Sequence, residues 1–451
     1  MVYFLLLLFI CLFIFINKAL PIISGYAAKT ICSGVFVAGR NEEEVIKKEL
    51  TAFPLSLASC KVDLQEKSVT ATVWRLAKKK AVYREGLGAT LINGISEAEL
   101  REQKFKIANR LNINQDEINW PFGNIINNTN AAVLNKNQLK TAIDEAFDDK
   151  KGFGTRAIIV LYKGEIVAER YAEGFCKDTK LASWSMTKSI TNALMGILVK
   201  QNILSLDASL PVDSWGNDAR KKITLTNLMH MGSGLSWWEN YTSASDATNM
   251  LYNERSMGEF AMRKSLRHAP GSRFSYSSGT TNLLSYIIRK QIGDEAYFRF
   301  PYEQLFYKIG MLNTVMEVDA SGTFVGSSYC YATAKDWARF GLLYMNDGIW
   351  GGQRILPAGW VRFTATPTEA KAPKKDGRYG AHWWVNASKK TDATGRKYPA
   401  VPEDCFYCQG YEGQYVWVIP SEELVVVRMA LEKHELDPNI FLPAVIKAFK
   451  N

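Results

Sequence analysis

The side chains of this chain best suited to covalent chemistry are a serine and a lysine three residues apart, Ser185 and Lys188. They open a segment, 185–200, in which apolar residues recur with the period of a helix. On such a helix the two side chains project from one face, one turn apart. A serine hydroxyl needs a base to take its proton, and a lysine serves as one when burial lowers its pKa. The pair therefore predicts Ser185 as a nucleophile activated by Lys188, at a helix N-terminus that favours a developing oxyanion.

A tyrosine among small hydroxyl residues is the second chemical feature. Tyr276 lies in the run 270–279, PGSRFSYSSG, just before a segment with a helical pattern. One interpretation is a capped helix start, with Ser277 or Ser278 as the N-cap. The other makes Tyr276 a phenol or phenolate that passes protons between Ser185 and the leaving group. The sequence leaves both open.

A glycine-rich segment near the C-terminus, 410–414, runs directly into a predicted strand. Glycines at such an edge let backbone amides approach a substrate carbonyl, as an oxyanion site requires. A plain hairpin turn is the alternative, and the segment alone does not decide between them.

Taken together, these motifs resemble the serine β-lactamase and penicillin-binding-protein superfamily. The similarity is to the branch of class C β-lactamases, DD-peptidases, esterases and 6-aminohexanoate-dimer hydrolases. The Ser-x-x-Lys motif falls on Ser185 and Lys188, the tyrosine motif on Tyr276, and the late Lys-Thr-Gly position on 411–413. The resemblance runs in order over about 154–449, and the connecting segments 204–207, 224–235 and 379–384 agree with it.

The resemblance implies an acyl-enzyme hydrolase that needs no metal or cofactor. It also implies an oxyanion hole made by the backbone amides of Ser185 and Gln414, with Tyr411, Gly413 and Ser278 beside the substrate. Two positions depart from the β-lactamase pattern. Ser278 stands where Tyr-x-Asn has asparagine, and Tyr411 replaces the usual lysine or histidine. Because the missing side chains help to hold β-lactam or peptide carboxylates and amides, we expect an ester or small-amide hydrolase rather than an efficient penicillinase.

The elements around these motifs favour an α+β fold in the domain 150–451. Strands are predicted at 156–162, 165–171, 414–420 and 423–429, and helices at 226–231, 281–290 and 333–346. Early and late strands with helices between them indicate a sheet covered by helices. The resemblance specifies an antiparallel sheet flanked by helices, with an all-helical subdomain. Residues 29–149 carry no recognisable motif, and their fold is unclear: a strand is predicted at 69–74, a charged helix at 97–111 and a linker at 120–130.

The first residues form an apolar stretch that we interpret as a signal peptide or membrane anchor over 1–28. Counted to Ile16 the stretch suits a signal-peptide core, and counted to Ile23 it reaches the roughly 20 residues that span a bilayer. Gly25 and Ala27 would satisfy the small-residue rule for cleavage. A buried core helix is disfavoured, because the stretch is apolar on all sides. Either outcome predicts an extracytoplasmic body, membrane-anchored or secreted.

Composition limits the remaining function classes. The net charge of +10 is spread along 451 residues, and no segment resembles a nucleic-acid-binding module in which basic and aromatic residues are interleaved. Nucleic-acid binding is therefore not expected. Six cysteines beyond the apolar stretch form an even set that an oxidising compartment would allow to pair. The spacing of Cys405 and Cys408 favours a local disulfide or free thiols over half a zinc site.

The predicted function is therefore a serine hydrolase that acts on an ester, an amide or a small peptide. Its expected partners are that substrate and, if the first helix is retained, a membrane. Two alternatives stay open. One is a non-catalytic envelope binding protein of the same fold, and the other is a peptidoglycan DD-peptidase or transpeptidase.

Overall fold

A computed structural model describes residues 2–126, 135–371, 378–387 and 395–450. Its centre is a seven-stranded sheet in which all neighbouring strands are antiparallel. The strands, in spatial order, are β12 (Arg378–Tyr379), β13 (Trp384–Val385), β14 (Phe406–Gly410), β15 (Gln414–Ile419), β16 (Leu424–Ala430), β5 (Thr155–Tyr162) and β6 (Glu165–Tyr171).

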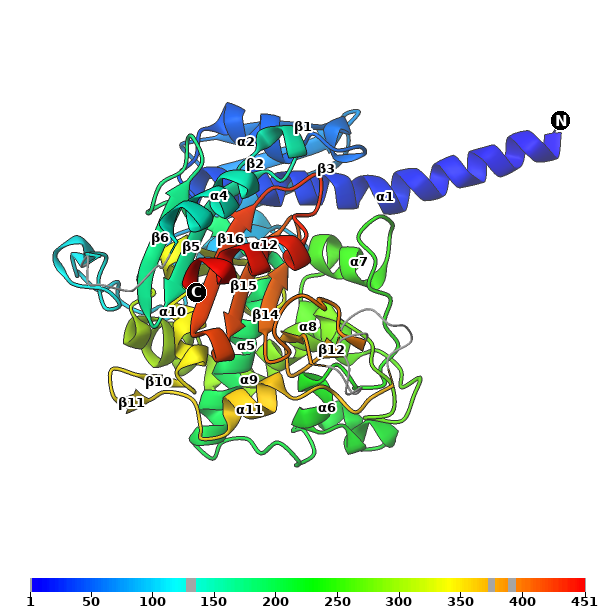
Figure 1. Ribbon diagram of the computed structural model, residues 1–451. Coiled ribbons are helices and arrows are strands. Elements are labelled where there is room, and N and C mark those ends of the chain that lie inside the picture. Colours follow the sequence, from blue (N-terminus) through cyan, green and yellow to red (C-terminus); the bar gives the residue numbers. More distant parts are fainter. Residues whose placement is uncertain (1, 127–134, 372–377, 388–394, 451) are drawn as a thin grey trace.

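Both faces of this sheet are buried, because its middle strands are apolar at successive positions. In β5, Ile159 and Leu161 belong to a core shared with α10 (Ala334–Met345). Ile158 and Val160 face the opposite core, which α4 (Lys136–Ala146) and α12 (Pro438–Ile446) cover. A strand buried on both faces has a continuous apolar run, as this one does. The result is a helix–sheet–helix sandwich (Figure 1).

The remaining helices form a second lobe beside the edge of the sheet (Figure 1). The central one, α5, packs against α9, and three short helices surround α9. Their bounds are Thr187–Lys200 for α5, Leu225–Met229 for α6, Asp246–Asn253 for α7, Met257–Met262 for α8 and Ser278–Tyr297 for α9. Smaller elements complete this part: β7 (Leu181–Ala182), β8 (Val315–Met316), β9 (Cys330–Ala332), β10 (Ile349–Trp350), β11 (Gln353–Arg354) and α11 (Trp360–Ala365). The predicted α+β architecture with a helical subdomain is confirmed.

The first hundred residues build a separate layer on top of this body, whereas α4 belongs to the body itself (Figure 1). A four-stranded antiparallel meander packs on the long first helix, and a short helix follows that helix. Their bounds are α1 (Val2–Phe36), α2 (Glu42–Glu49), β1 (Ala58–Asp63), β2 (Ser68–Val73), β3 (Leu76–Arg84), β4 (Gly88–Leu91) and α3 (Glu97–Glu102). Alanines on both surfaces let the helix and the sheet approach closely, among them Ala27, Ala28, Ala71, Ala81 and Ala89. We call residues 20–91 the N-terminal layer.

A buried ion pair fixes α1 in this layer. Lys29 pairs with Glu317, and Ser33 Oγ donates to the same carboxylate at 2.8 Å. The backbone N–H of Ala89 in β4 also donates to Glu317, at 2.7 Å. Because a buried charge is costly unless it is paired and hydrogen-bonded, this network sets where α1 lies against the sheet.

The first helix differs from its predicted role. Only one helix of the described residues is long and apolar enough to cross a membrane, Ile16–Phe36, and most of it is buried in the protein. The expectation that this stretch is not a core helix is wrong for residues 20–28, since Leu20, Ala27 and Ala28 are fully buried. The helix also continues without a break past residue 28. Its first part projects away from the body (Figure 1).

Three smaller expectations also have an outcome. The strand at 69–74 is confirmed as β2, whereas the helix predicted at 97–111 ends as α3 at Glu102. The backbone of Gln103 leaves the helical conformation (ψ 115°), and its side chain donates to Ala320 O at 3.0 Å and accepts from Arg84 at 2.8 Å. The cysteines that the structure describes are all free thiols. The linker predicted at 120–130 lies partly outside the described residues.

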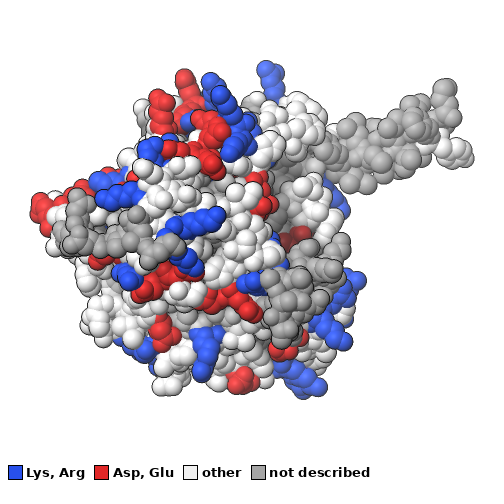
Figure 2. Space-filling view, in the orientation of Figure 1, with Lys and Arg blue, Asp and Glu red and all other residues white. Residues whose placement is uncertain are grey.

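Acidic and basic side chains alternate over the surface, without a large patch of one sign on the face that Figure 2 shows. The spread of charge expected from the sequence is therefore seen on this face.

Candidate active site

The predicted serine and lysine lie together at the start of α5. Residues Trp184–Met186 form a 3-10 turn that leads directly into the helix. Lys188 is 1% exposed, and its Nζ lies 3.0 Å from Ser185 Oγ. Its Nζ also donates to Ser278 Oγ and to Ser327 O, each at 3.0 Å. A charged lysine has three N–H donors, whereas the neutral amine has two and a lone pair. The neutral form would therefore accept a hydrogen bond from Ser185 while it keeps the other two contacts.

Burial changes the proton affinity of this lysine. Desolvation lowers the pKa of Lys188 to about 8, although the nearby charge of Glu239 acts in the opposite direction. With this pKa, about a tenth of the amine is neutral at pH 7, and most of it is neutral at pH 9. Lys188 thus meets both requirements for a base, which are contact with the hydroxyl and a lowered pKa.

Tyr276 faces the same two side chains. Lys188 Nζ lies 4.9 Å from the centre of its ring, and Ser185 is near enough to its hydroxyl to act on its pKa. Burial raises the pKa of Tyr276, so at neutral pH the group is a phenol that can give a proton. Of the two forms expected from the sequence, the geometry favours the phenol over the phenolate.

The serines after Tyr276 have separate tasks. Ser277 is the N-cap of α9, and its side chain accepts from the Thr280 N–H at 2.9 Å. Ser278 turns inward, where its Oγ accepts from Lys188 and donates to Glu239 Oε1 at 2.6 Å. The capped-helix interpretation and the functional one are therefore compatible.

Sequence reasoning missed a carboxylate and a tyrosine of this site. Glu239 accepts from the Ser278 N–H at 2.9 Å and from the Tyr241 hydroxyl at 2.6 Å. Trp237 Nε1 donates to the same carboxylate. Tyr241 also lies 2.9 Å from Ser278 Oγ, so it contacts both Glu239 and the serine that links Glu239 to Lys188. Both residues lie on a loop that carries no motif, and only the neighbouring tryptophans mark it in the sequence.

The glycine-rich segment forms the opposite side of the site. It is the hairpin turn between β14 and β15, in which Glu412 (φ 64°) and Gly413 (φ 83°) are left-handed. A Cβ at Gly410 would lie 2.3 Å from Ser183 O, so glycine lets this turn approach the chain just before Ser185. The hairpin alternative thus holds, and the turn lies beside the predicted nucleophile.

Two other residues of this turn have distinct environments. The Gln414 side chain is tied to the sheet, because its Nε2 donates to Ala430 O at 2.6 Å and its Oε1 accepts from Ala430 N at 3.1 Å. Only its backbone is left for the oxyanion role that the resemblance implies. Tyr411 is 58% exposed, and its ring makes an edge contact with Trp184 at 5.9 Å.

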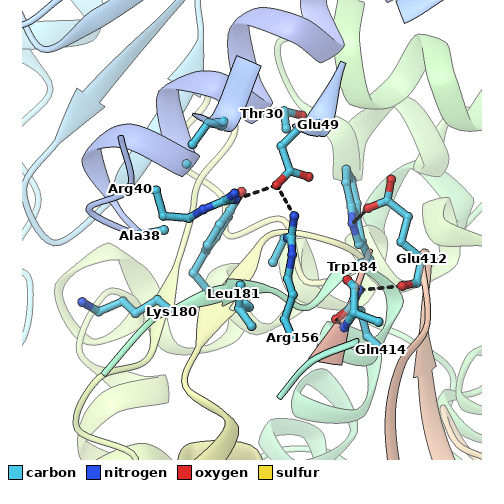
Figure 3. A pocket seen from close by; sticks show the side chains of 15 residues that line it. Thr30, Ala38, Arg40, Glu49, Arg156, Lys180, Leu181, Trp184, Glu412 and Gln414 are labelled. Atoms are coloured by element: carbon cyan, nitrogen blue, oxygen red, sulfur yellow. Dashed lines mark hydrogen bonds and ion pairs between the residues drawn. The ribbon is translucent and has the colours of Figure 1, made fainter. Parts of the chain in front are cut away.

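A polar chamber lies between the N-terminal layer and the body, and Trp184, the residue before Ser185, lines it (Figure 3). Trp184, Glu412, Gln414, Arg156 and Glu49 are among the residues that line it. Glu49 accepts from Arg40 at 2.5 Å and from Arg156 at 2.6 Å, whereas the carboxylate of Glu412 accepts from Trp184 Nε1 at 3.2 Å. Burial and the negative charge of Glu49 raise the pKa of Glu412 to about 7.

Comparison with known proteins agrees with this geometry. The beta-lactamase family model matches residues 141–447. The chain belongs to the beta-lactamase family. It is therefore a serine hydrolase, and the matched segment contains every site residue predicted from the motifs, from Ser185 to Gln414. The whole N-terminal layer, which borders the polar chamber, lies before the matched segment.

Individual relatives are distant but cover most of the catalytic part. The 6-aminohexanoate-dimer hydrolase of Paenarthrobacter ureafaciens is 23% identical over 301 residues, which are 61% of this chain and 72% of that protein. A solved structure from Bacillus anthracis, assigned to the same hydrolases, has a TM-score of 0.57 at 22% identity and covers 76% of this chain and 89% of its own. The hydrolase EstCE1, described as having promiscuous acyltransferase activity, has a TM-score of 0.56 at 14% identity, with coverage of 70% and 98%. These structures establish the fold.

Proposed function

We propose that this protein hydrolyses an ester or a small amide through an acyl-enzyme on Ser185. The observation that carries the proposal is the 3.0 Å contact between Lys188 Nζ and Ser185 Oγ, made by a lysine that is 1% exposed. A lysine used only for structure would be expected to pair with a carboxylate. Instead, its contacts are two hydroxyls and a carbonyl.

The proposed reaction begins when neutral Lys188 takes the proton of Ser185 as its oxygen attacks the substrate carbonyl. The negative charge moves to the carbonyl oxygen, which the backbone N–H groups of Ser185 and Gln414 would stabilise. Tyr276 gives its proton to the leaving oxygen or nitrogen as that bond breaks, and it regains a proton from Lys188 through the Ser185 region. Water then attacks the ester, with the same groups acting in reverse, and Ser185 leaves with its proton restored.

An ester or small amide fits this site better than a β-lactam. Ser278 points its hydroxyl at Lys188 and Glu239, where the β-lactamase pattern has an asparagine that contacts substrate. Tyr411 presents an exposed ring in place of a cation. The named relatives include a 6-aminohexanoate-dimer hydrolase, which supports the same choice.

A fluorophosphonate probe tests the acyl-enzyme proposal, because it reacts only with an activated serine. We expect labelling of the wild type and its loss in Ser185→Ala, with Ser189→Ala in the same helix as the matched control. A folded wild type that is not labelled would favour the non-catalytic binding protein. Turnover of p-nitrophenyl esters, linear amide oligomers, nitrocefin and D-Ala-D-Ala peptides would then rank the substrates, and acyl transfer to added amines would identify a transpeptidase.

We further propose that α1 is retained and anchors an extracytoplasmic body. Cleavage near Gly25 or Ala27 would remove Leu20 and Ile23, which are 0% and 4% exposed in the fold. Residues 2–19 would then be the membrane-embedded part. Sequencing the N-terminus of the membrane fraction tests this, since a retained helix begins near residue 1 and resists extraction at high pH. A soluble mature chain that starts near residue 28 would contradict it.

A further inference from the structure

The residue just before the predicted nucleophile has an unusual backbone. Trp184 has a φ of 46°, in the left-handed region that bulky side chains avoid. Such a conformation persists only where surrounding contacts hold it in place. Because Trp184 and Ser185 share one 3-10 turn, whatever holds Trp184 also sets the direction of the Ser185 side chain.

Three contacts hold the indole of Trp184. The ring of Tyr26, from α1, stacks on it at 5.9 Å with an interplanar angle of 15°. Glu412 accepts from its Nε1 at 3.2 Å, and Tyr411 covers a ring edge at 5.9 Å. Figure 3 shows Trp184 beside Glu412 in the polar chamber, on the side that faces the N-terminal layer. Two of these contacts come from the β14–β15 turn and the third from outside the family-matched segment.

Tyr26 itself is firmly placed. It is 8% exposed and contacts Tyr252 of α7 at 5.8 Å. The preceding Gly25 is so close to α7 that a Cβ there would lie 2.9 Å from the Cβ of Tyr252. One turn further along, Lys29 makes its buried pair with Glu317. The helix therefore has no room to rotate or slide, and the Tyr26 ring is a fixed surface.

A second connection joins the N-terminal layer to the same region. Glu49, at the end of α2, is bonded to Arg40 and to Arg156 of β5. The charge of Arg156 lowers the pKa of Glu412, whereas the charge of Glu49 raises the same pKa. The N-terminal layer thus acts on Trp184 in two ways. Tyr26 contacts its indole, and Glu49 shifts the pKa of Glu412, whose carboxylate accepts a hydrogen bond from that indole (Figure 3).

We propose that Tyr26 is a positioning residue for Ser185 that acts through Trp184. Catalysis therefore requires the N-terminal layer, which carries Tyr26. The proposal rests on the acyl-enzyme function proposed above. Tyr26 does not touch the reacting atoms. It limits the rotation of the turn that carries them, and an error of about 1 Å in such a position costs up to a hundredfold in rate.

The test compares Tyr26→Ala, Tyr26→Leu and Tyr26→Phe with Tyr83→Ala. Tyr83 is the matched control, because it packs against Phe36 in the same layer, at 5.9 Å, without contact to Trp184. We expect Tyr26→Ala to lower kcat for a p-nitrophenyl ester by about tenfold or more, with KM changed less than about twofold. Tyr26→Phe keeps the stacked ring and should recover the rate. Tyr83→Ala should lower Tm while kcat is kept.

The outcomes separate this inference from the proposed function. A folded wild type that fluorophosphonate does not label refutes the acyl-enzyme function, whereas equal rates of labelling for wild type and Tyr26→Ala overturn the positioning role alone. An equal loss of kcat in Tyr83→Ala would also overturn it, because the effect would then be general loosening of the layer. If both non-aromatic variants fail to fold, Trp184→Leu decides: it removes the ring on which Tyr26 stacks and should lower kcat, and a wild-type kcat there overturns the proposal.

Discussion

Two buried ionisable groups flank Ser185, one on each side. On the side of Tyr276, burial lowers the pKa of Lys188 to about 8. On the side of Trp184 and the polar chamber, burial raises the pKa of Glu412 to about 7. Desolvation is the main cause of both shifts. The surroundings differ, since Lys188 contacts Ser185 Oγ whereas the carboxylate of Glu412 accepts a hydrogen bond from the indole of Trp184. A shifted pKa therefore does not identify a catalytic group by itself, and contact with the reacting atoms makes the difference.

The largest effect on the reaction rate is expected on the Lys188 side of Ser185. Lys188→Ala removes the base that contacts Ser185, and we expect acylation to slow by about a thousandfold. The burst of p-nitrophenol in stopped flow measures this step. Lys200→Ala, at the other end of α5, is the control and should react normally. Near-normal acylation by Lys188→Ala would remove the proposed distinction between the two sides.

Tyr276→Phe comes next, with an expected loss of about a hundredfold. Because the phenol is proposed to move protons in both half-reactions, the burst and the steady-state rate should fall together. An amide substrate should be affected more than an activated ester, since its leaving group needs the proton more. Unchanged rates for both substrates would show that the phenol has no catalytic use.

Glu239→Gln tests the Lys188 side of this comparison through the pH dependence of the reaction rate. The rate should rise as pH increases through the pKa of Lys188, about 8, because the neutral amine is the active form. The charge of Glu239 raises that pKa, so the Gln variant should reach its plateau at lower pH. We expect less than about a tenfold loss at the plateau, since the amide keeps part of the hydrogen bonding. A profile that does not move would mean that Glu239 has no electrostatic effect on the base.

Glu412→Gln is expected to change the rate least and to act on stability instead. The folded-state pKa of Glu412 is raised from 4.5 to about 7, so the folded state binds its proton more tightly than the unfolded state. The contribution to stability is therefore complete below about pH 4.5 and is lost as pH rises through about 7, a change of about 3 kcal/mol. Urea midpoints at pH 5 and pH 8 measure it. The variant should show a smaller difference between the two pH values than the wild type.

Local sequence patterns were enough to predict the part of the site that contains Ser185, Lys188 and Tyr276. Ser185 lies in the 3-10 turn that leads into α5, Lys188 lies in its first turn, and the periodicity of that helix is visible in the sequence; Tyr276 comes just before the N-cap of α9. Glu239 and Tyr241 were not predictable in this way, because they reach the site from a loop whose position depends on how α7 and α9 pack. No spacing in the sequence encodes that arrangement.

The N-terminal layer shows the opposite case. A bilayer and a protein core select the same apolar residues, so hydrophobicity alone could not tell that residues 20–36 would be buried in the fold. The available signal was polar: Lys29 and Ser33 lie four residues apart on one face, and both bind Glu317. A charge inside an apolar helix needs a partner, which indicates a protein environment. The helix at 97–111 was predicted too long, since the local pattern does not show that Gln103 leaves the helical conformation and bonds to residues distant in the sequence.

The unbroken course of α1 has a consequence for how the body would stand at a membrane. With a rise of 1.5 Å per residue, residues 2–19 measure about 27 Å, close to the thickness of a bilayer's hydrocarbon core. No flexible linker separates this stretch from Leu20, which is already packed in the protein. The enzyme would therefore sit directly on the lipid headgroups in a single orientation. Its choice of substrates would then depend on how far from that surface each one can reach, as well as on chemistry.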